Sequence, residues 1–171
     1  IYGPIQSRRL GNSLGINIGS SHKKYCSWNC VYCQCGIKNT DVAPEELPTL
    51  EKITDEFRNH VLQHPDIECV TIAGNTEPTL HPHLFSLIRE LKKIRLASRA
   101  RWKINILSNG SNLDDVNAVR ACDSADETWV KLDCAVPELF QKLNMPYTKQ
   151  DSPETQITRI KKLKNPRIQT L

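Results

Sequence analysis

Long apolar runs and export signals are missing from this chain. No stretch of its 171 residues approaches the ~20 consecutive apolar residues of a membrane-spanning helix, and its first residues lack the charged-then-apolar pattern of a secretory signal. Even so, 39% of the residues are hydrophobic, which is enough for one sizeable core. We therefore expect a single globular domain that is cytoplasmic and has no membrane partner.

Phosphate-binding glycine loops and a strong charge of one sign are missing too. The seven glycines form neither G-x-G-x-x-G nor G-x4-G-K-S/T, so a dinucleotide or nucleoside triphosphate site is not supported. The net charge is only +4, and we interpret the one basic group, Arg159, Lys161, Lys162 and Lys164, as complementing a helix C-terminus. A nucleic-acid partner is therefore the less favoured interpretation.

The cysteines are unevenly distributed. Four of the seven lie between Cys26 and Cys35, whereas Cys69, Cys122 and Cys134 are isolated. An odd and clustered set indicates a metal site in a reducing compartment rather than a disulfide framework. Cys69 and Cys122 fall within a predicted strand and a predicted helix, so we interpret them as buried thiols.

Cys26, Cys30 and Cys33 form a C-x3-C-x2-C loop. Three thiolates on one short loop suit a cubane iron–sulfur cluster, because each ligates a different iron and the fourth iron keeps an open position. A zinc site is the alternative, but it usually takes four ligands from two separated pairs, and no second pair with that spacing follows. We therefore predict that these three cysteines hold a 4Fe–4S cluster and that Cys35 is not a ligand.

Around this loop, short apolar stretches alternate with amphipathic ones, which is typical of parallel β/α units rather than hairpins. We predict strands at 14–18, 67–73, 102–107 and 128–132 with a fifth beginning near Arg167. We predict helices at 50–62, 83–96, 113–122 and from Pro153 with Ser152 as N-cap, and a short helical turn at 137–143. Such a chain forms a β/α barrel or a doubly wound sheet. In both, the chemistry lies at the carboxyl ends of the strands.

Three of these strand ends carry polar segments. They are Gly74-Asn75-Thr76-Glu77, Ser108-Asn109-Gly110 and Lys131-Leu132-Asp133. Each is weak alone, because the first two also fit ordinary turns or caps, and Lys131 with Asp133 also fits a surface salt bridge. Their joint occurrence with the cysteine loop, in this order, makes chance a poor explanation.

With Tyr32 directly before the last cysteine, the loop resembles the signature of the radical S-adenosylmethionine (SAM) superfamily. The segment from Gly3 to Gly15, together with Gly74 to Pro82 and Lys131 to Pro146, resembles a little-characterised group in it, often described as iron–sulfur oxidoreductases. The resemblance implies an α/β fold, a partial parallel β/α barrel of the radical SAM type. It also implies a 4Fe–4S cluster whose open iron chelates SAM, and one-electron cleavage of SAM that starts a radical reaction on a substrate.

The resemblance assigns cofactor roles to the strand ends as well. Glu77 is expected to meet the ammonium group of SAM together with backbone groups of Gly74, Asn75 and Thr76. Thr76 stands where many relatives carry glycine, which puts the carbonyl geometry in doubt. The rest of the SAM shell is expected to comprise Tyr32, Ser108, Asn109, Lys131 and Asp133, and no catalytic side chain is assigned.

An electron donor such as a flavodoxin or ferredoxin is implied in the same way, while the substrate stays unidentified. Two rival interpretations stay open: a non-enzymatic zinc or iron–sulfur binding module, and an electron-transfer protein.

The chain begins at Ile1 without Met and reaches Leu171 inside the predicted fifth strand. We therefore expect residues 1–171 to be a radical SAM core domain that is incomplete at its carboxyl end.

Overall fold

The computed structural model describes residues 1–20, 23–36 and 46–170. These residues form one six-stranded sheet whose strands lie side by side in chain order. β1 pairs antiparallel with β2, and each later pair of neighbours is parallel. The strands are β1 (Tyr2–Ser7), β2 (Gly11–Ile16), β3 (Cys69–Ile72), β4 (Lys103–Ser108), β5 (Glu127–Lys131) and β6 (Pro166–Gln169). The predicted α/β class with a mainly parallel sheet is confirmed.

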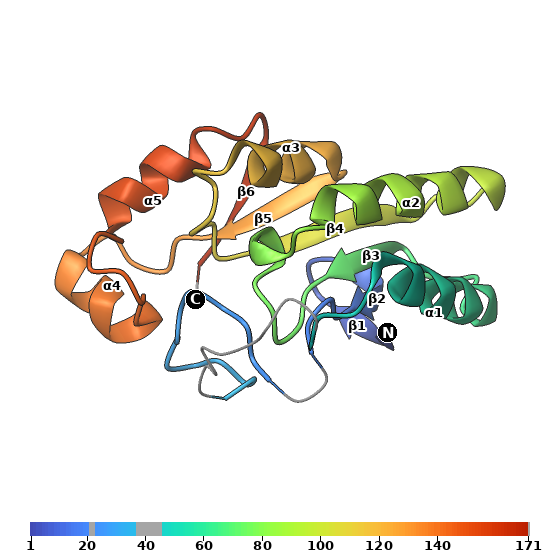
Figure 1. Cartoon of the computed structure of the whole chain (residues 1–171), viewed down its shortest axis with the longest axis horizontal. Helices are drawn as coiled ribbons and strands as arrows, with labels where there is room; N and C mark the ends of the chain where they lie inside the picture. The colour runs from blue at the N-terminus through green and yellow to red at the C-terminus, as the bar shows by residue number, and fades with distance from the viewer. Residues whose placement is uncertain (21–22, 37–45, 171) are drawn as a thin grey trace.

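Helices follow the parallel strands. They are α1 (Leu50–Gln63), the short 3₁₀ turn η2 (Pro78–Leu80), α2 (Leu84–Ala97), α3 (Val116–Ser124), α4 (Pro137–Asn144) and α5 (Pro153–Ile160). Ser152 caps α5 through a capping box with Thr155, and Pro153 opens the helix as predicted. Figure 1 shows α1, α2 and α3 in a row along the sheet, with α4 near the segment 23–36. Among the described residues no helix has the length and apolarity needed to cross a membrane.

The alternation of side chains along the strands separates an apolar face from a polar one. Toward the helices, Leu14, Val70 and Ile104 are fully buried in the core that α1 and α2 cover. On the other face, the hydroxyls of Ser13 and Thr71 lie 2.7 Å apart. The helices thus cover one face of the sheet, and the strand ends are free to build a site.

The N-terminal hairpin corrects the expectation of purely parallel units without hairpins. β1 lies at the edge of the sheet, where most of its side chains are exposed, so it lacks the apolar alternation that identifies a buried strand. It also carries Pro4, a residue that sheets tolerate at their edges. β2 begins at Gly11 and ends at Ile16, two residues before the predicted end.

Candidate cluster and cofactor site

A cavity of about 380 Å³ lies where β3, β4, β5 and β6 end and faces the cysteine loop that follows β2. Its lining contains every predicted site residue except Asp133, namely Cys26, Cys30, Tyr32, Cys33, Gly74, Asn75, Thr76, Glu77, Ser108, Asn109 and Lys131. The fold therefore brings together side chains that the sequence separates by up to about a hundred positions, because the carboxyl ends of parallel strands share one edge.

The cysteines of the loop line this cavity without converging on one point. Cys26, Cys30 and Cys33 are half-buried and Cys35 is exposed. In the described ranges, no group of three or more His, Cys, Asp or Glu side chains is arranged to hold a single metal ion. A cubane cluster places each thiolate on a different iron, so its ligands lie apart from one another.

Cys35 lies next to the predicted ligands rather than away from them. Its thiol donates to the carbonyl oxygen of Gly74 at 3.6 Å, and it lines the same cavity. Burial and the neighbouring Cys33 raise the pKa of the Cys35 thiol. The choice between Cys33 and Cys35 as a ligand therefore stays a prediction that variants must test.

The loop is held mainly by contacts to other segments. The backbone N–H of Tyr25 donates to the carbonyl of Asn75 at 2.9 Å, and the N–H of Val31 donates to the carbonyl of Leu143 at 2.9 Å. The first contact fixes the loop to the end of β3, and the second fixes it to the last turn of α4. Backbone groups that a helix end leaves free are satisfied in this way.

Trp28 anchors the middle of the loop. Its side chain is fully buried and packs edge-on against Phe140 of α4, with ring centroids 5.2 Å apart. Its indole Nε1 donates to Oδ2 of Asp151 at 3.2 Å, and Oδ1 of Asp151 accepts from Arg159 at 2.5 Å. Sequence reasoning missed Asp151 and Arg159. The available signal was the need of a buried indole N–H for an acceptor.

Glu77 ties the end of β3 to the end of β4. Its carboxylate is buried, and its Oε1 accepts from the backbone N–H and hydroxyl of Thr79 and from the hydroxyl of Ser108, at 3.1, 2.7 and 2.5 Å. Oε2 accepts from the backbone N–H of Asn109 at 2.7 Å. Burial raises the pKa of Glu77 despite these donors.

The turn after β4 needs a glycine. Gly110 has φ of +75°, and a Cβ there would lie 2.6 Å from Val130 Cγ1 and 2.7 Å from Gln156 Nε2. The turn directs the side chain of Asn109 back toward the loop, where its Nδ2 lies 3.4 Å from Sγ of Cys26.

Lys131, Asp133 and Tyr32 form one network at the end of β5. The Tyr32 hydroxyl donates to Oδ2 of Asp133, and Nζ of Lys131 lies 3.3 Å from the same hydroxyl and 4.7 Å from the ring centroid. Burial, and then Asp133, raises the pKa of Tyr32 above its usual range. Lys131 and Asp133 thus meet through Tyr32, and in the described part of the chain they form no salt bridge with each other.

Basic side chains of the group Arg159, Lys161, Lys162 and Lys164 form ion pairs with nearby acidic side chains. Arg159 pairs with Asp114 at 2.8 Å as well as with Asp151, and Lys162 pairs with Asp114 at 2.5 Å. Two of the four basic residues, Arg159 in α5 and Lys162 just after it, are therefore engaged in ion pairs with neighbouring segments.

Residues 20–168 match the family model of the Radical SAM superfamily. The chain belongs to this superfamily. It is 35% identical over 151 residues to a UPF0026 protein of Helicobacter pylori, covering 87% of this chain and 47% of that protein. A UPF0026 protein of Methanocaldococcus jannaschii is 30% identical over 149 residues, covering 85% and 44%. The radical SAM chain thus spans about half the length of the curated relatives it matches.

Solved structures show the same fold at low sequence identity. The structure of native anSMEcpe with bound AdoMet superimposes with a TM-score of 0.63 at 17% identity, covering 92% of this chain and 42% of that one. TYW1 with a lysine-pyruvate adduct bound gives a TM-score of 0.56 at 19% identity, covering 85% and 51%. The predicted partial radical SAM barrel is confirmed, and the cofactors of the superfamily are a 4Fe–4S cluster and SAM.

The residues around the cavity of this radical SAM chain fit those cofactors. Amide N–H groups of Asn109 and Asn144 are directed at the sulfurs of Cys26 and Cys30, which suits thiolate ligands because a thiolate only accepts hydrogen bonds. The cavity volume of about 380 Å³ also lies within the ~300–1,000 Å³ typical of small-molecule sites.

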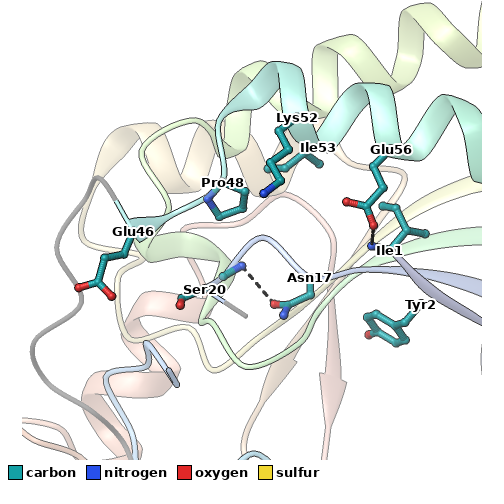
Figure 2. A pocket seen from close by; sticks show the side chains of 10 residues that line it. Ile1, Tyr2, Asn17, Ser20, Glu46, Pro48, Lys52, Ile53 and Glu56 are labelled. Atoms are coloured by element: carbon teal, nitrogen blue, oxygen red, sulfur yellow. Dashed lines mark hydrogen bonds and ion pairs between the residues drawn. The ribbon is translucent and has the colours of Figure 1, made fainter. Parts of the chain in front are cut away.

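A second cavity of about 370 Å³ lies between the start of the chain, the segment after β2 and α1. Figure 2 shows Lys52 of α1 pointing toward the space beside Asn17. Oδ1 of Asn17 accepts from the backbone N–H of Gly19 at 3.1 Å. The lining of this cavity includes none of the residues predicted for the cluster or for SAM.

Proposed function

We propose that this chain is a radical SAM enzyme whose core domain holds a 4Fe–4S cluster on Cys26, Cys30 and Cys33. The observation that carries the proposal is the convergence of the cysteine loop and three polar strand ends on one cavity, in a chain of this superfamily. When bound, the cluster and SAM together supply a one-electron cleavage that starts a radical reaction on a substrate still to be identified.

The three cysteines would each ligate one iron and leave the fourth open to SAM. The chain holds these ligands on a loop that is fixed at both sides, by Tyr25 to the end of β3 and by Val31 to the end of α4. Trp28 and Phe140, both fully buried, exclude water from behind the loop. These contacts hold the backbone of the loop that carries the proposed ligands.

The strand ends would bind and orient SAM. Oε2 of Glu77 accepts one hydrogen bond from within the described residues, which leaves acceptor capacity for an ammonium group. The carbonyl of Asn75 already accepts from the backbone N–H of Tyr25, and that of Gly74 accepts from the Cys35 thiol, so Thr76 is the better candidate for a backbone contact to that ammonium. Ser108, Asn109, Lys131, Asp133 and Tyr32 complete the proposed shell on the β4 and β5 side.

We further propose that an external one-electron donor, such as a flavodoxin or ferredoxin, reduces the cluster, and that the reaction takes place in the cytoplasm. The superfamily supports a need for a reductant, because the cleavage consumes an electron.

The experiment is anaerobic reconstitution of the full-length protein and of its single cysteine variants. We expect wild type to contain iron and sulfide, to give an EPR signal when reduced, and to change that signal when SAM is added. Cys26→Ala, Cys30→Ala and Cys33→Ala should lose the cluster, whereas Cys35→Ala, the matched control on the same loop, should keep it.

Each opposing result has a defined meaning. Loss of the cluster in Cys35→Ala with retention in Cys33→Ala would contradict the ligand assignment. Stoichiometric zinc without sulfide would support a non-enzymatic binding module. A cluster whose spectrum ignores SAM, with no 5'-deoxyadenosine formed, would support an electron-transfer protein.

A further inference from the structure

Two buried asparagine amides point at two of the three predicted cluster sulfurs. Nδ2 of Asn109, at the end of β4, lies 3.4 Å from Sγ of Cys26. Nδ2 of Asn144, the last residue of α4, lies 3.6 Å from Sγ of Cys30. They come from segments far apart in the chain, and each lies near a different thiol. Nδ2 of Asn109 also lies 3.0 Å from the Ser27 hydroxyl, and Nδ2 of Asn144 also lies 3.2 Å from the Tyr32 hydroxyl and 2.7 Å from Oδ2 of Asp133, so each sulfur shares its amide with oxygen acceptors.

The orientation of both amides is fixed by partners of known polarity. Oδ1 of Asn109 accepts from the backbone N–H of Ser111 at 2.8 Å, and a backbone N–H can only donate, so the NH₂ group must face the sulfur. Nδ2 of Asn144 donates to Oδ2 of Asp133 at 2.7 Å. A flipped amide would put its oxygen against that carboxylate.

Burial makes these contacts stronger than surface ones. Asn144 is 0% exposed and Asn109 is 5% exposed. In surroundings of low dielectric constant, a donor near a charged acceptor has a larger electrostatic effect than in water. The negative charge of an iron–sulfur cluster rises on reduction, so donors to its sulfurs stabilise the reduced form more than the oxidised form.

We propose that Asn109 and Asn144 are positioning residues that donate N–H···S hydrogen bonds to the Cys26 and Cys30 ligands and thereby raise the reduction potential of the cluster. This inference rests on the proposed function. It assigns to Asn144 a role that the sequence motifs do not indicate, and to Asn109 a contact with the cluster ligand in addition to the proposed SAM shell.

The test is the midpoint potential of the reconstituted full-length protein without SAM, measured by EPR-monitored redox titration. Asn144→Leu keeps the approximate shape of the side chain and removes its donors. We expect the equilibrium constant for cluster reduction to fall about three- to tenfold, which is a downward shift of about 30 to 60 mV for a one-electron couple. Asn109→Leu should shift the potential in the same direction. The two shifts should roughly add, because they act through different ligands.

Asn12→Leu is the matched control. Asn12 is also buried, at 8% exposure, but it lies at the amino end of β2, away from the cysteine loop, and its Nδ2 donates to Oδ2 of Asp66. Its variant should leave the potential unchanged even if it lowers the stability of the fold. Pulsed ENDOR of the reduced protein gives an independent readout, since an exchangeable proton coupling present in wild type should be lost in Asn144→Leu.

The possible failures are distinguishable. A wild-type protein that takes up no cluster would overturn the proposed function itself. A loaded wild type with the same potential as loaded Asn144→Leu and Asn109→Leu would overturn only this inference. If one variant fails to take up iron, the other decides the question. If both variants fold but neither takes up iron, the two asparagines have a structural role and do not tune the potential.

Discussion

Replacing Asp151 by Asn tests how the cysteine loop is anchored. Asp151 is 1% exposed and accepts from Trp28 and from Arg159. Removing one partner of a buried ion pair costs about 3–5 kcal/mol when the other charge is left uncompensated. Here Arg159 keeps a second carboxylate, Asp114, at 2.8 Å, and Asn still offers Trp28 an acceptor oxygen. We therefore expect Asp151→Asn to lower the free energy of unfolding by about 2 kcal/mol.

The assay is urea unfolding of the apoprotein, and Asp114→Asn is the matched control. Asp114 binds the same guanidinium, but its side chain is 59% exposed, so its variant should lose less than about 1 kcal/mol. Trp28→Phe keeps the ring that packs on Phe140 and removes the indole N–H. A double-mutant cycle with Asp151→Asn should therefore show coupling of about 1 kcal/mol. Equal losses for the two aspartate variants, without coupling, would mean that packing alone holds Trp28.

Two further substitutions test buried residues of the segment between β3 and α2. Glu77→Gln replaces a carboxylate that accepts from four donors, so it should destabilise the apoprotein by about 1–3 kcal/mol. It should also weaken SAM binding about tenfold in an EPR titration. Unchanged affinity would place the SAM ammonium elsewhere. Burial lowers the pKa of His81 to about 4, below the ~6.5 of an unfolded chain. Between these values the unfolded state binds more protons, so stability should fall as the pH drops. This loss of unfolding free energy between neutral pH and pH 4 should be on the order of 2 kcal/mol. His81→Asn keeps an acceptor for the His83 N–H and should reduce the loss, as measured by urea unfolding at the two pH values. Equal losses in wild type and variant would contradict the assignment.

The meeting of the strand ends could be predicted from the sequence because it follows from topology alone. Once the chain is assigned as parallel β/α units, Glu77, Ser108 and Lys131 must end at one edge, whatever the exact bounds of each strand. Strand bounds differed from the prediction by up to three residues, as at β2 and β3, without moving any of these residues out of the cavity.

The long-range contacts that hold the cysteine loop could not be predicted in this way. Asn144 lies 114 residues after Cys30, and Asp151 lies 123 residues after Trp28. No local periodicity or spacing connects such pairs. The short helical turn predicted at 137–143 lies within α4, but the local sequence could not show that the last residue of this helix lies near a thiol. β1 was missed for a local reason, because an exposed edge strand lacks the apolar alternation by which buried strands are recognised.

The position of α4 explains why this helix matters to a site built from strand ends. The cysteine loop has no strand or helix of its own among residues 23–36, so the contacts to other segments determine its shape. At the carboxyl end of α4, backbone carbonyls accept from Val31 and from Asn29, and the side chain of Asn144 reaches Cys30. One helix end thus sets the path of the loop and the surroundings of a ligand. Because metal binding adds its free energy to the folded state that presents the ligands, a loaded cluster would stabilise α4 together with the loop.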